Sequence, residues 1–174
     1  MIRFSTLDVE MPPIDPLRDK AWIEAVAEKH GKTIGELYYY FCSDDKLLEI
    51  NRERLGHDFY TDIVTFPLTD CETVLSSEFC ISTDRIKENA ETFGRSYESE
   101  LHRVIIHGVL HLIGFDDHTE EDEKEMRNQE EKALELLIEV KTTNHHTVMA
   151  DTDPPSPLRG DKTSQIGDCG AGPQ

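Results

Sequence analysis

The segment HGVLHLIGFDDH, residues 107–118, holds three histidines and two aspartates among apolar residues. His107 and His111 are four residues apart, so on a helix both imidazoles lie on one face, one turn apart. Two histidines on a rigid helical face are a common start of a zinc site, although such a pair alone is a weak signal. The segment therefore indicates metal chemistry, for which a third ligand is needed.

The turn that follows these histidines could supply the third ligand. Residues 96–114 carry apolar side chains around most of a helical circumference, which predicts a largely buried helix. Gly114 fits the left-handed position at which a helix ends, and the chain after it returns toward the histidines. Gly108, inside the helix, could let another backbone or a substrate approach closely. Three protein ligands would leave a fourth position for water, as in a catalytic zinc site.

The spacing is similar to the metzincin pattern HExxHxxGxxH. His107, His111 and Gly114 match that pattern, and its third ligand position falls on Asp117, with His118 one residue late. A zincin protease carries its general base, a glutamate, directly after the first histidine, where this chain has a glycine. The missing glutamate argues against a peptidase.

The same segment closely resembles the YbeY family of metal-dependent endoribonucleases, whose members carry HGxLHLxGxDH. The match extends to an aromatic residue at 115 and to five further positions, namely Gly108, Leu110, Leu112, Gly114 and Asp116. A second block, TDIVTFP at 61–67, looks like the family's TDVLSFP, and SEFCISTD at 77–84 looks like its GDIVIC strand. The resemblance covers residues 30–140.

This resemblance implies a small α+β domain, one zinc ion (Zn²⁺) and hydrolytic cleavage of single-stranded RNA. In the family the activity serves maturation of the 16S rRNA 3′ end and ribosome quality control. The implied partners are therefore ribosomal RNA and a ribosomal subunit or ribosomal proteins, and neither DNA nor a membrane is expected.

Two positions depart from the family pattern. The family's third histidine aligns without gaps to Asp117, whose carboxylate is a competent zinc ligand and is the favoured one. A one-residue insertion would make His118 the ligand instead. Asp116 could orient a ligand histidine or cap the helix end. A family arginine expected near the substrate phosphate aligns with Leu55, so we assign no catalytic arginine and leave the catalytic residues open.

Strands mixed with helices surround these blocks, which predicts an α+β fold: a small mixed β-sheet packed with helices, one of them a metzincin-like zinc-binding helix. Residue patterns and capping signals predict strands at 2–9, 34–42, 61–66 and 73–82, and helices at 16–31, 43–56, 84–94, 96–114 and 119–140. The acidic run 116–131 is typical of a solvated helix face. We expect the domain to span residues 1–140, followed by a disordered polar tail at 141–174.

The formal net charge of −18 argues against nucleic-acid binding by bulk charge. RNA binding would then depend on a ribosomal partner protein or on basic residues that gather near the metal, namely Arg52, Arg54, Arg85, Lys87, Arg95 and Arg103. The four cysteines form no CxxC pair, which indicates free thiols in a reducing compartment. With no signal peptide and no apolar run of membrane-spanning length, the protein is expected to be cytoplasmic.

Two other functions remain open at this point. A non-catalytic ribosome-assembly factor would have a closed structural zinc site that could include both Asp117 and His118. A zinc hydrolase of another substrate is the second alternative. Thr61, Asp62 and Thr65 are candidates for the wall of a cleft. His57, in the loop before this strand, could contact phosphate or metal or could be a plain surface histidine.

Overall fold

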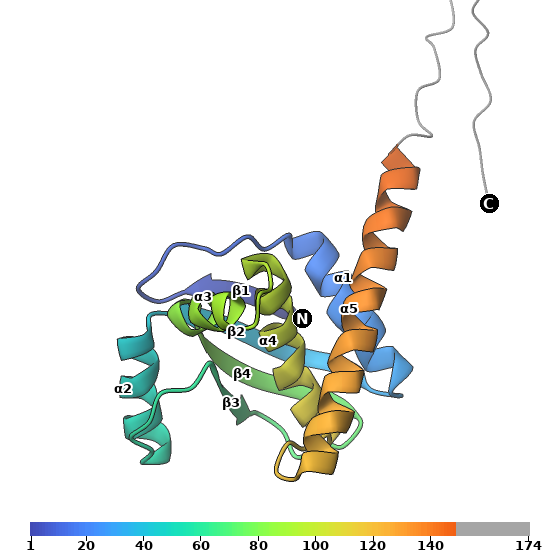
Figure 1. Cartoon of the computed structure of the whole chain (residues 1–174). Coiled ribbons are helices and arrows are strands. Elements are labelled where there is room, and N and C mark those ends of the chain that lie inside the picture. Colours follow the sequence, from blue (N-terminus) through green and yellow to red (C-terminus); the bar gives the residue numbers. More distant parts are fainter. Residues whose placement is uncertain (149–174) are drawn as a thin grey trace, which may run out of the picture.

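The computed structural model describes residues 1–148, without the side chains of 141–148 (Figure 1). In chain order the elements are β1 (Ile2–Thr6), α1 (Pro16–Lys29), β2 (Thr33–Cys42), α2 (Asp44–Leu55), β3 (Ile63–Pro67), β4 (Val74–Ser82), α3 (Thr83–Thr92), α4 (Tyr97–Ile113) and α5 (Glu120–Val148). Every strand and helix that the sequence predicts is present, and the expected α+β class is confirmed.

The strands form one mixed sheet in the order β1-β2-β4-β3. The strands β1, β2 and β4 are parallel neighbours, whereas β3 pairs antiparallel with β4, with Ile63 opposite Ile81. Because β3 is an edge strand, no other strand of the described residues pairs with its outer edge, and that edge can line a cavity. Figure 1 shows α4 lying across the sheet, with α5 running beside α4 and α1.

The helix α4 is buried because its apolar residues meet the sheet on one side and α1 and α5 on the other. Leu101, Ile105 and Val109 are fully buried in a core that also contains Phe79 of β4. A Cβ atom at Gly108 would lie 2.7 Å from Cε1 of Phe79 and 2.8 Å from Cδ1 of Ile63. The close approach that Gly108 permits is therefore made by side chains of the sheet, and not by a backbone or a substrate.

The helix α5 extends to Val148, past the boundary at residue 140 that the sequence analysis set. The physical reason is that no glycine or proline interrupts the sequence between Gly114 and Pro154, so nothing stops the helix at that boundary. The rest of the predicted tail, 149–174, lies outside the described residues. Within residues 1–148, no helix combines the length and apolar character that a membrane crossing requires.

Candidate metal centre

The two ends of α4 set the position of its histidines. Ser96 caps the first turn, where its side chain accepts a hydrogen bond from the Ser99 amide, and Gly114 ends the helix with a φ of 117°. The amide of Phe115 then donates to the Leu110 carbonyl at 3.0 Å, which folds the chain back against the last turn. This reversal turns the segment after Gly114 back toward the histidine face, as the sequence predicts.

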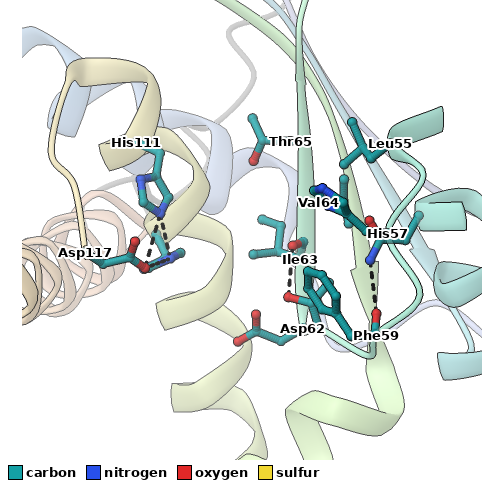
Figure 2. Close-up of a pocket in the computed structure, with 12 residues that line it drawn as sticks. Leu55, His57, Phe59, Asp62, Ile63, Val64, Thr65, His111 and Asp117 are labelled. Atoms are coloured by element: carbon teal, nitrogen blue, oxygen red, sulfur yellow. Dashed lines mark hydrogen bonds and ion pairs between the residues drawn. The ribbon is translucent and has the colours of Figure 1, made fainter. Parts of the chain in front are cut away.

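Three side chains converge on this face. The Nε2 atoms of His107 and His111 are 3.0 Å apart, and Oδ2 of Asp117 lies 3.7 Å from the first and 3.6 Å from the second (Figure 2). We call His107, His111 and Asp117 the triad. His118 points elsewhere: its Nε2 contacts Oδ1 of Asp116 at 3.2 Å, and its side chain is 81% exposed. The structure therefore brings Asp117 to the histidine pair and leaves His118 and Asp116 away from it.

The Nδ1 atom of each triad histidine is hydrogen-bonded to an oxygen acceptor. Nδ1 of His111 lies 3.0 Å from the carbonyl oxygen of Phe115, and Nδ1 of His107 lies 2.7 Å from Oε1 of Glu130. A carbonyl or carboxylate oxygen can only accept, so each Nδ1 carries the hydrogen. In the neutral rings, both Nε2 atoms then present lone pairs to each other across 3.0 Å.

A cation between the two Nε2 atoms would remove the repulsion between their lone pairs. The spacing of the triad fits zinc. Bonds of about 2.0–2.2 Å at tetrahedral angles place two ligand atoms about 3.3–3.6 Å apart. The three separations within the triad, 3.0, 3.6 and 3.7 Å, fall close to this range. The donor set of two imidazole nitrogens and one carboxylate is also one that zinc accepts, with a fourth position left over.

Glu130 of α5 is a part of this centre that the sequence analysis missed. Its Oε1 accepts from Nδ1 of His107 and, at 3.2 Å, from Nη1 of Arg103, and the residue is only 5% exposed. The acidic run 116–131 predicts a solvated helix face, and at Glu130 that prediction is wrong because the residue is buried. Its spacing gave the missing signal: Glu130 follows Met126 by four residues and precedes Ala133 by three, so it lies on the buried stripe of α5.

Arg103 contacts the same oxygen of Glu130 as His107 does. Its guanidinium also donates to Oε1 of the buried Glu100 at 2.6 Å and to Oδ2 of Asp62 at 3.5 Å. Burial alone would lower the pKa of Arg103, but the hydrogen bond to Glu100 and the nearby carboxylates outweigh it and raise that pKa. Arg103 therefore stays charged and fixes the carboxylate that orients His107.

The triad forms one side of a cavity of about 350 Å³ (Figure 2). The other lining residues come from α2, β3 and the loop between them: Asn51, Leu55, His57, Phe59, Thr61, Asp62, Ile63, Val64 and Thr65. The cleft-wall candidates Thr61, Asp62 and Thr65 thus lie where the sequence analysis expected them, and His57 lines the same cavity. The free side of β3 is the wall that faces the triad.

The basic residues do not gather at this cavity, contrary to the expectation. Arg52 pairs with Asp58, Arg54 pairs with Glu78 at 3.0 Å, and Arg85 pairs with Asp44 at 2.9 Å. Among the described residues, no lysine or arginine lines the cavity. Of the predicted cluster only Arg103 is linked to the triad, through Glu130. The acidic residues, which outnumber the basic ones, engage the arginines elsewhere.

Comparison with known proteins identifies the family. The family model described as Endoribonuclease YbeY matches residues 10–138. The Endoribonuclease YbeY of Phocaeicola vulgatus is 47% identical over 137 residues, which cover 79% of this chain and 99% of that protein. The Endoribonuclease YbeY of Bacteroides thetaiotaomicron is 47% identical over 135 residues, covering 78% of this chain and 98% of that protein.

A solved structure agrees with these sequence matches. The solution structure of a Thermotoga maritima protein is 30% identical and superposes with a TM-score of 0.54, covering 90% of this chain and all of that one. The family match spans β2, β3, β4, α4 and most of α5, and so includes the whole triad. The chain belongs to the YbeY family of endoribonucleases.

Proposed function

We propose that this chain is a zinc-dependent endoribonuclease that cleaves single-stranded RNA at the triad of His107, His111 and Asp117. We further propose that its substrate is the 3′ end of 16S rRNA, that it acts in ribosome quality control with a ribosomal subunit or ribosomal proteins, and that it does so in the cytoplasm. The observation that carries the proposal is the convergence of three ligand atoms beside an open cavity. The relatives named Endoribonuclease YbeY support the reaction class.

The chain's own residues have separable tasks in this reaction. The two histidines present Nε2 to the ion, because Phe115 and Glu130 hold both Nδ1 atoms. Zinc, when bound, lowers the pKa of a water molecule and stabilises negative charge on a phosphate oxygen. Asp117 adds a negative ligand where a histidine would be neutral, so we expect a weaker Lewis acid and either a slower nuclease or a preference for another metal.

The lack of a fourth protein ligand near the triad, among the described residues, favours a catalytic metal site over a purely structural one. A closed site would need a fourth protein ligand such as His118, yet that side chain is 81% exposed and pairs with Asp116. The cavity beside the triad instead gives a phosphodiester access to the ion. The assembly-factor alternative therefore gains no support from this geometry.

The experiment is cleavage of a single-stranded RNA by the purified, zinc-loaded protein beside His111→Ala and His118→Ala. The unsubstituted protein and His118→Ala should cleave, whereas His111→Ala should lose activity by about 100-fold or more, and a chelator should abolish cleavage. Equal cleavage by all three preparations would indicate a contaminating nuclease. A zinc-loaded protein that cleaves no RNA would contradict the proposal in favour of an assembly factor.

A further inference from the structure

The end of α2 and the loop that follows it carry exposed side chains on the cavity wall opposite the triad. Leu55, His57 and Phe59 all line the cavity, and we call them the aromatic lip (Figure 2). Leu55 is 42% exposed and Phe59 is 57% exposed. The rings of His57 and Phe59 stack with centroids 5.2 Å apart and planes 22° apart, so they form one platform.

This platform is held in place by the buried Asn51. Its side-chain Nδ2 donates to the Phe59 carbonyl at 3.0 Å, and its backbone carbonyl accepts from the His57 amide at 3.3 Å. Gly56, with a φ of 68°, turns the chain between α2 and the loop. The backbone is thus fixed while the side chains stay open to solvent, as in a binding surface whose geometry is preorganised.

The charges around the cavity do not suit recognition by phosphate contacts alone. Asp62 and Asp117 are its acidic lining residues, and no described lysine or arginine lines it. Arg54 of α2 is already paired with Glu78 and lies 3.8 Å over the ring of Phe66. A nucleobase, in contrast, offers an uncharged π-face that stacks on an aromatic side chain whatever the base.

We infer that the aromatic lip stacks an unpaired RNA base next to the phosphate that the triad cleaves. This inference rests on the proposed function and adds the contact by which a strongly acidic chain holds its substrate. It also supplies a reason for acting on single strands, because a base within a duplex is covered by its neighbours and cannot reach the lip. The lip and the ion then hold one nucleotide from opposite sides of the cavity.

The most direct test uses tryptophan fluorescence. The chain has a single tryptophan, Trp22, which is fully buried, so Phe59→Trp adds an exposed reporter to a quiet background. Single-stranded oligoadenylate, added with a chelator to prevent cleavage, should quench Phe59→Trp in a saturable manner. Phe93→Trp is the matched control, because Phe93 is 63% exposed and does not line this cavity. Equal quenching of both variants, or of neither, would overturn the inference.

Binding affinities provide the second measurement. Phe59→Ala should bind labelled single-stranded RNA about fivefold or more weakly, Phe59→Trp should restore binding, and Phe93→Ala should leave it unchanged. The loss should also be the same at low and high salt, because stacking releases no counterions. An RNA with one abasic site at the stacked position keeps its charge and should show no further loss with Phe59→Ala.

These experiments distinguish a failure of the base-stacking inference from a failure of the proposed nuclease function. If the unsubstituted protein cleaves RNA and Phe59→Ala binds it normally, the aromatic lip is not a base site while the nuclease proposal stands. If Phe59→Trp is quenched but the zinc-loaded protein cleaves nothing, the base site is supported and the nuclease proposal fails.

Discussion

The helix α4 carries two histidines that each lie in a cluster with a carboxylate and an arginine, but only His107 lines the cavity beside His111 and Asp117. His102 is 1% exposed in its side chain; its Nδ1 lies 2.7 Å from the Glu98 carbonyl and its Nε2 lies 3.1 Å from Nη2 of Arg18 and 3.3 Å from Oδ1 of Asp19. Both ring nitrogens are therefore bonded inside the fold.

His107 uses the same kinds of partner differently. Glu130 holds Nδ1 at 2.7 Å, Arg103 holds Glu130, and Nε2 is left at the cavity beside His111 and Asp117. A neutral imidazole has one donor and one acceptor nitrogen, so the ring that bonds through both has nothing left for a metal. The free Nε2 of His107, and not the presence of a histidine–carboxylate pair, therefore distinguishes the proposed metal centre from the His102 cluster, which consists of His102, Arg18 and Asp19.

The largest expected effect is a loss of stability on Asp19→Ala, which removes the carboxylate of the His102 cluster. This buried carboxylate contacts both Arg18 and His102, so its removal leaves buried polar groups unpaired. We expect the free energy of unfolding to fall by about 3 kcal/mol in urea titrations, while the zinc affinity of the folded protein is unchanged. Glu24→Ala, at an exposed position of the same helix, is the control. A loss of zinc affinity with no loss of stability would contradict the distinction.

The reciprocal change, Glu130→Gln, should act on the metal. The amide can no longer offer His107 and Arg103 a charged acceptor, so zinc affinity should fall by about 10- to 100-fold. Competition with a chromophoric chelator measures this affinity. Glu131→Gln makes the same change at the next, exposed position and should have no effect. Equal affinities for the two variants would show that Glu130 does not orient its histidine.

The smallest effect concerns the acid stability of the His102 cluster. Burial alone would raise the pKa of Asp19, but its contacts with His102 and Arg18 outweigh it and lower that pKa in the folded state. Its stabilising contribution is therefore complete above about pH 4 and is lost as the pH falls through the lowered folded-state value. Urea unfolding from neutral pH to about pH 3 should show the difference between the unsubstituted protein and Asp19→Asn shrinking below about pH 4. A difference that stays constant in acid would rule out this titration.

Local signals made α4 and the triad predictable from sequence. Ser96 and Gly114 mark the helix ends, and the four-residue spacing of its histidines sets their common face. Glu130 was missed because its partner His107 is distant in sequence, so only the buried stripe of α5 could have indicated it. The expectation that the arginines gather near the metal was wrong for a related reason. The number of charges in a sequence does not show which carboxylate will pair with each guanidinium.

The measurement that tests the account most directly is anomalous diffraction at the zinc edge from crystals of the zinc-loaded protein. We predict a zinc peak bonded to Nε2 of His107, Nε2 of His111 and the Asp117 carboxylate, at about 2.0–2.2 Å. The exposed group of Asp116, Asp117 and His118 is the competing cluster among the described residues. A peak at that group, or none between the two α4 histidines, would contradict the proposed metal centre.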